Sequence, residues 1–241
     1  MASSSLDIPI VRAGGERRVY TWAAAIALLF VFAGFAPTFY LKGVYGAPEL
    51  SQLKFVHGLV MTAWFTLFLV QARLVAAGRI SMHRQLGMAG LVVALLVVTM
   101  GVTTALASAR AGFAPLGLSP LVFLVMPLGE MIVFAGLFTA AIAMRKRAAH
   151  HKRLMLVTTL AMLTPAMARL PFEFVKTGGP PVFFAMTDLV ILACIAFDTA
   201  RNRRLHPAFA GALAFVVVVQ VGRLVISQTP QWMTFAKWLV G

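Results

Sequence analysis

Two short basic stretches each begin with a histidine and lead into a long apolar run. HRQLG begins at His83 and HKRLM begins at His151. Two neutral imidazoles on facing helices are the axial ligand set of a bis-histidine haem b. The guanidinium groups of the neighbouring Arg84 and Arg153 are suited to bind the carboxylates of the haem propionates. His83 and His151 are therefore candidate ligands of a haem iron.

The alternative is that these histidines have no ligand and are solvated at a membrane interface. His150 adjoins His151, so the sequence does not decide which of the two would bind iron. His206 stands before a proline in another basic connection, and we expect it to be solvated. His57 opens a different apolar run that has no histidine partner on the run containing Glu130, so the sequence predicts at most one bis-histidine haem.

A second group of chemistry-bearing side chains lies inside the apolar runs, where ionisable residues are costly and often functional. We expect Glu130 to face the bundle interior beside Asp188 or an arginine. The group could be a structural ion-pair network, a ligand pocket, a proton path, or a metal site of His57, Glu130 and Asp188. Asp198 can reach Arg201 on its own helix. The predicted outer polar cluster comprises His57, Glu130, Arg169, Asp188, Gln220 and Arg223.

The elements that position these residues are long apolar segments. The chain of 241 residues is 61% hydrophobic and 12% charged, which exceeds what a soluble core can hide. We expect an all-α polytopic membrane helix bundle in one integral membrane domain, 1–241, with the lipid bilayer as its solvent. Its parts are a polar tail at 1–19, a bundle at 20–227 and an interfacial segment at 228–241. Seven runs are long enough to span a bilayer: 20–41, 55–77, 87–109, 121–144, 154–170, 181–200 and 208–227.

The net charge of +14 is distributed unevenly along the chain. Fourteen of the 21 Lys and Arg residues fall before the first run or in every second connection after it. This is the positive-inside pattern, which predicts a cytoplasmic N-terminus and an external C-terminus in a bacterial inner membrane. The basic charge is therefore a topology signal, and we expect no nucleic-acid partner. Cys194 is the one cysteine, so the chain has no disulfide framework.

The segment from His57 to Leu170 resembles a bacterial family of predicted membrane proteins of unknown function, of the type labelled DUF. The shared pattern is a histidine opening a helix, a glutamine near its end, H-R-x-x-G, H-x-R-x-M and then R-L. This chain shows them as His57, Gln71, His83-Arg84-Gln85-Leu86-Gly87, His151-Lys152-Arg153-Leu154-Met155 and Arg169-Leu170. The resemblance covers less than half of the chain and implies no particular activity.

The histidine layout is more loosely similar to transmembrane b-type cytochromes that use ascorbate or similar donors. Those proteins carry two histidine pairs on four core helices, and this chain lacks the histidine of the fourth span. The resemblance implies haem binding and electron transfer with a quinone or another redox partner. The alternatives are a transporter, sensor or assembly factor that uses the outer polar cluster as its binding pocket, or a membrane-embedded metal-dependent hydrolase.

Overall fold

The protein is described by a computed structural model that covers residues 8–115 and 117–241, with side chains from residue 18 onward. Of the predicted tail at 1–19, residues 1–7 lie outside the described residues, and the first helix already begins at Ile8. The described part of the chain is all-helical. Its helices are α1 (Ile8–Phe35), the π-helical turn η1 (Ala36–Tyr40), α2 (Gln52–Ala76), α3 (Ile80–Arg110), α4 (Pro120–Ala143), α5 (Ala148–Ala161), α6 (Thr164–Met167), α7 (Glu173–Asn202), α8 (Pro207–Ile226) and α9 (Pro230–Val240).

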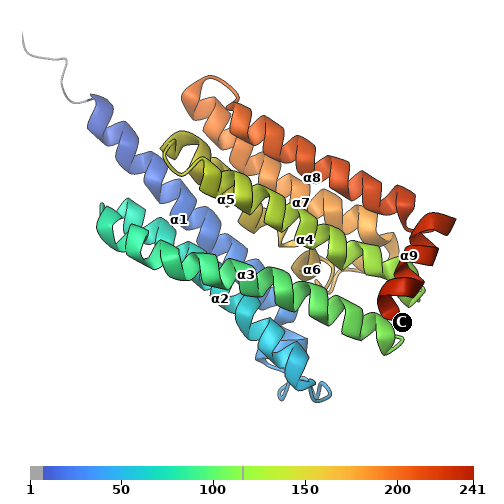
Figure 1. Cartoon of the computed structure of the whole chain (residues 1–241). Helices are drawn as coiled ribbons and strands as arrows, with labels where there is room; N and C mark the ends of the chain where they lie inside the picture. The colour runs from blue at the N-terminus through green and yellow to red at the C-terminus, as the bar shows by residue number, and fades with distance from the viewer. Residues whose placement is uncertain (1–7, 116) are drawn as a thin grey trace, which may run out of the picture.

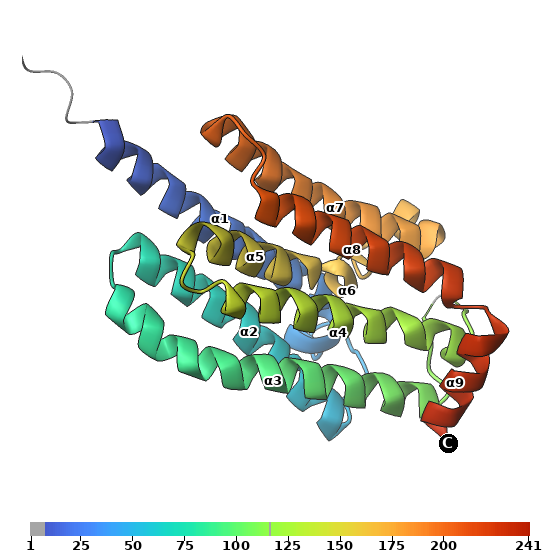
Figure 2. The same cartoon turned by 45° about the horizontal axis from the view of Figure 1, so that its top comes forward.

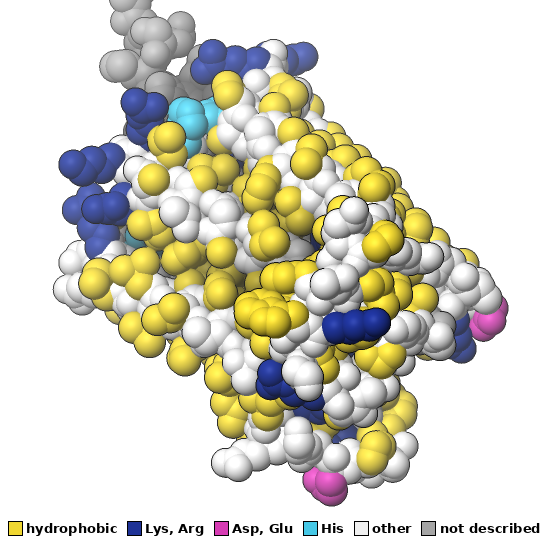
Figure 3. All heavy atoms as spheres, turned by 45° about the vertical axis from the view of Figure 1, so that its right-hand side comes forward, with side chains coloured by type: hydrophobic (Ala, Val, Ile, Leu, Met, Phe, Trp, Pro, Cys, Tyr) yellow, Lys and Arg dark blue, Asp and Glu magenta, His cyan; other side chains and the backbone are white. Residues whose placement is uncertain are grey.

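Six of the helical segments are long and apolar enough to cross a membrane, and they correspond to six of the seven predicted runs. Large apolar side chains stand exposed along their flanks, including Leu29 (64% exposed), Leu95 (65%) and Val218 (67%). Figure 3 shows hydrophobic side chains spread over the flank of the molecule, with Lys and Arg most numerous at the top and upper left and a few others lower on this face. A bilayer is the solvent that such a surface requires. The six segments are Arg18–Tyr40, Gln52–Ala76, Ile80–Arg110, Pro120–Ala143, Glu173–Asn202 and Pro207–Ile226.

The fifth predicted run, 154–170, is not one continuous helix. It divides into α5, which has 14 residues, and α6, which has four. At about 1.5 Å per residue, α5 is roughly 21 Å long, which is shorter than the hydrocarbon layer of about 30 Å. Almost every side chain from Arg153 to Thr164 is buried, because α5 packs against α1, α4, α7 and α8. The prediction of seven spanning helices therefore holds for six, with a broken helix in the middle of the bundle.

Pro165 explains the break. Proline has no backbone N–H, so it cannot donate to the carbonyl of Ala161 one turn earlier. The Thr164 hydroxyl donates to that carbonyl instead, at 3.2 Å. A second close contact holds α6 in place, because a Cβ on Gly34 of α1 would come within 2.4 Å of the Ala166 carbonyl oxygen. Only a glycine permits α1 to approach α6 so closely.

The connections gather at two opposite ends of the bundle (Figures 1 and 2). The connections 77–79, 144–147 and 203–206 lie at the end where α1 begins, and we call this the basic end because it carries most of the arginines of the connections. The end of α3 and the terminal helix α9 lie at the other end. This alternation is the one that the charge pattern requires. That the basic end is cytoplasmic stays a prediction.

The C-terminal helix α9 closes the end opposite the basic one. Arg110 at the end of α3 donates to the carbonyl oxygens of Leu239 and Val240, at 3.1 and 2.9 Å. The Trp232 indole N–H donates to the Leu121 carbonyl at 2.8 Å. Trp238 on the outer side of α9 is 73% exposed. Tryptophan side chains favour the depth of the lipid head groups. The interfacial position of 228–241 stays a prediction.

The topology yields a first testable prediction. Reporter fusions placed after residues 80, 148 and 204 should all report the cytoplasm, because all three connections lie at the basic end and positively charged connections stay inside. Fusions after residues 115 and 241 should report the outside and serve as the matched controls. A reporter at 204 on the opposite side from those at 80 and 148 would mean that α5 and α6 do not complete a crossing.

Candidate functional sites

The first candidate site is the histidine pair at the basic end. The rings of His83, in the first turn of α3, and His151, in the first turn of α5, face each other with centroids 6.5 Å apart and planes inclined at 74°. The His151 Nδ1–H donates to the carbonyl of Ala141, at 2.8 Å. This hydrogen bond fixes the ring tautomer, so that the lone pair of the neutral ring lies on Nε2. A backbone carbonyl on the far nitrogen is the usual partner of a metal-binding histidine.

His150 does not take part in this pair. Its ring packs instead against the ring of His206, with centroids 4.6 Å apart. Of the two adjacent histidines, His151 is the one whose ring lies beside His83. That either of them binds iron stays a prediction. His206 is also not merely a solvated residue, as was expected, since its Nδ1 accepts a hydrogen bond from the Ala208 amide at 3.1 Å and caps α8.

The two arginines next to the histidine pair, Arg153 and Arg84, differ in burial and in their contacts. Arg153 is buried, and its Nε and one terminal nitrogen bind both carboxylate oxygens of Asp198, at 3.0 and 2.8 Å. Its other terminal nitrogen donates to the Ala149 carbonyl. Asp198 thus forms an ion pair with Arg153 of α5. The sequence had suggested only Arg201, on the same helix, as its partner. Arg84 is exposed and remains the better placed candidate for a haem propionate.

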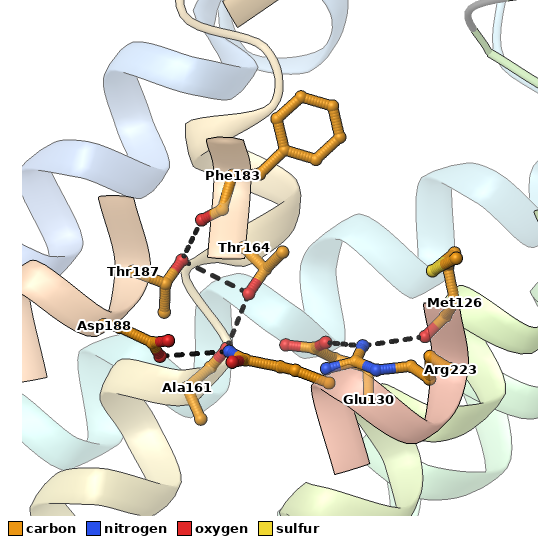
Figure 4. Close-up of polar contacts among 9 residues, drawn as sticks. Met126, Glu130, Ala161, Thr164, Phe183, Thr187, Asp188 and Arg223 are labelled. Atoms are coloured by element: carbon orange, nitrogen blue, oxygen red, sulfur yellow. Dashed lines mark hydrogen bonds and ion pairs between the residues drawn. The ribbon is translucent and has the colours of Figure 1, made fainter. Parts of the chain in front are cut away.

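The second candidate site, which we call the buried polar cluster, consists of Glu130, Thr164, Thr187, Asp188, Gln220 and Arg223 (Figure 4). A terminal nitrogen of Arg223 donates to the Glu130 carboxylate at 2.6 Å and to the Met126 carbonyl at 3.1 Å. Both charged side chains are only 4% exposed. The Gln220 amide donates to the Asp188 carboxylate at 3.0 Å. Asp188 also interacts electrostatically with both members of the ion pair. The expectation that Glu130 faces the interior beside an arginine is confirmed.

The break between α5 and α6 supplies the rest of this cluster. The Thr164 hydroxyl lies 3.2 Å from the Thr187 hydroxyl, which in turn donates to the Phe183 carbonyl. Neither threonine was singled out in the sequence. The signal that could have found Thr164 is the proline that follows it, because a proline within a span leaves a carbonyl that a neighbouring hydroxyl can satisfy.

Two predicted members of the outer polar cluster make other contacts. Arg169 donates to the Pro165 carbonyl at 2.7 Å and lies over the Phe35 ring, 4.5 Å from its centroid. His57, on α2, has a buried Nδ1 without a hydrogen-bond partner among the described residues. Within residues 18–115 and 117–241, no three His, Cys, Asp or Glu side chains come together to hold a metal ion. The three-ligand metal site of His57, Glu130 and Asp188 is therefore not formed.

Gly129 makes room for the ion pair. A Cβ at this position would come within 2.3 Å of Cδ and 2.6 Å of Cγ of Arg223. The arginine cannot easily move aside, because its guanidinium group is held by Glu130 and lies 4.5 Å from the centroid of the Phe184 ring. The glycine on α4 and the arginine on α8 thus form one packing unit.

This contact predicts that Gly129→Ala destabilises the protein by about 1–3 kcal/mol, the usual cost of forcing extra volume into a packed interior. The measurement is the thermal unfolding midpoint in detergent. Gly222→Ala on α8 is the matched control, because a Cβ there meets nothing within 4 Å, so the better helix propensity of alanine leaves stability equal or slightly higher. Equal effects of the two substitutions would contradict the packing argument.

The His206 cap predicts a pH dependence. Partial burial, together with the charges of Arg153 and His150, lowers the pKa of His206 from its ordinary value of 6.5. Below pH 6.5 the unfolded chain therefore binds more protons at this residue than the folded one, so stability is lost as the pH falls through this window. A protonated Nδ1 also cannot accept from the Ala208 amide. The unfolding midpoint should thus decrease on acidification.

The matched variant is His206→Asn, because asparagine caps a helix well and does not titrate. The difference in unfolding midpoint between the wild type and this variant should grow as the pH falls from 8 to 5. A difference that stays constant over this range would show that the protonation of His206 is not coupled to folding.

In comparisons with known proteins, no family model, no curated protein and no solved structure matches the chain.

Proposed function

We propose that this integral membrane protein binds one b-type haem between His83 and His151 and transfers electrons through it. The observation that carries the proposal is the separation of the two rings, 6.5 Å between centroids. Two imidazoles this close together, from two different helices, would be able to hold one haem iron as its two protein ligands.

The number of candidate metal ligands supports a haem over a bare metal ion. A protein-bound zinc ion needs three or four protein ligands, whereas a haem iron takes four nitrogens from the porphyrin and only two from the chain. His83 and His151 form a pair of imidazoles with no third His, Cys, Asp or Glu close enough for a metal site in the described part of the chain. A pair without a third ligand suits a porphyrin better than a bare metal ion.

The residues around the pair have distinct roles in this proposal. The Ala141 carbonyl orients the His151 ring and leaves its Nε2 as the nitrogen available to a ligand. Arg84 is exposed and free to approach a propionate, while the side chain of Arg153 is engaged with Asp198 and instead fixes α5 against α7. The bound haem would supply one-electron chemistry, and a quinone or another redox partner would exchange electrons with it.

A second candidate function is transport or sensing through the buried polar cluster. The observation that favours it is the broken helix α5–α6, whose break places Thr164 beside the ionisable residues of α4, α7 and α8. Discontinuous helices with buried ionisable side chains at membrane depth are typical of transporter binding sites. The two functions use different ends of α5, so one experiment on the histidine pair separates them.

That experiment is an absorption spectrum. Protein purified from haem-replete cells should show a Soret band, and His83→Ala or His151→Ala should each abolish it, since a bis-histidine haem loses affinity without either ligand. His150→Ala is the matched control and should retain the band, because its ring faces His206. A protein that remains colourless after hemin is added would refute the proposal and leave the polar-cluster function in its place.

A further inference from the structure

The buried polar cluster carries an excess of negative charge. Its ionisable side chains are Glu130 on α4, Asp188 on α7 and Arg223 on α8 (Figure 4). With both carboxylates ionised, two negative charges face one positive charge. An uncompensated charge at this depth in a bilayer costs several kcal/mol. One of the two carboxylates must therefore be neutralised.

The hydrogen bonds indicate which carboxylate that is. Arg223 donates to Glu130 and to the Met126 carbonyl, while its buried Nε has no hydrogen-bond partner in the part of the chain that the structure describes. Asp188 is held by the neutral amide of Gln220 and has no ion pair within 4 Å among the described residues. The charge of Arg223 is thus paired with Glu130, and Asp188 has only the neutral amide of Gln220 as a hydrogen-bond donor.

The surroundings of Asp188 offer no other compensating cation. From α8 it faces Gln220 and Arg223, and from α4 it faces Glu130, whose charge is of the same sign. From α6 the cluster is completed by the hydroxyl of Thr164, which is neutral. A proton on the carboxylate removes the excess charge and leaves one oxygen to accept from the Gln220 amide.

We propose that Asp188 is a proton-binding site in the membrane interior. The residue is half-buried, and the next residue on α7, Leu189, is 65% exposed on the lipid-facing flank. A carboxyl group at the lipid-facing edge of the bundle can be reached by a lipid-soluble reagent, whereas Glu130 is only 4% exposed. This site is independent of the histidine pair, and it makes the protein competent for proton-coupled chemistry or transport.

The test uses dicyclohexylcarbodiimide, a lipid-soluble reagent that adds to protonated carboxyl groups and ends as a stable acylurea. The full-length protein in detergent or liposomes is treated at pH 7, digested and analysed by mass spectrometry. We expect Asp188 to be labelled and Asp188→Asn to lose this label. Glu130→Gln should weaken the label on Asp188, because Arg223 then lacks its carboxylate partner and its charge favours the ionised form of Asp188.

Each alternative outcome contradicts the proposal in a recognisable way. Labelling of Glu130 in place of Asp188 would assign the proton to the other carboxylate. Protection of Asp188 by sodium chloride, but not by choline chloride at the same pH and ionic strength, would make the neutralising cation sodium. An unlabelled Asp188 would mean that it stays ionised. Asp188→Asn still accepts from Gln220, so an unchanged unfolding midpoint confirms that the variant is folded.

Discussion

One backbone carbonyl in the middle of the bundle governs much of the structure. Pro165 leaves the Ala161 carbonyl without an amide partner, in a region where no water is available to satisfy it. The Thr164 hydroxyl takes over that role and also reaches the Thr187 hydroxyl on α7. The break in the helix is thereby stabilised by side chains from two elements, and the same side chains line the buried polar cluster.

Two buried ion pairs connect the helices around this break. Arg153 and Asp198 join α5 to α7, and Glu130 and Arg223 join α4 to α8. Removing one partner of such a pair typically costs about 3–5 kcal/mol, because the other charge is left buried and unpaired. The pairs therefore specify which helices are neighbours more than they add net stability. Asp188 differs from these four residues in having only an amide as its partner.

Some of this arrangement could be read from the sequence and some could not. The six continuous spans followed from apolar length, and the equal depth of His83 and His151 followed from their positions at the start of two parallel helices. That the two rings come together depends on how the helices pack, which the sequence did not show. The position of Glu130 followed from the cost of exposing it to lipid. The partner of Arg153 could not be predicted, because the pairing with Asp198 depends on how α5 packs against α7. The division of 154–170 was missed because its composition is as apolar as that of a true span, while its length is set by a single proline.

The shortness of α5 has a consequence for how the protein is made. Its 14 residues begin with AAHHKR, and α1, α4, α7 and α8 pack around it. Two of these neighbours, α7 and α8, follow α5 in the chain. The packing around α5 is therefore complete only after both of these helices have been synthesised.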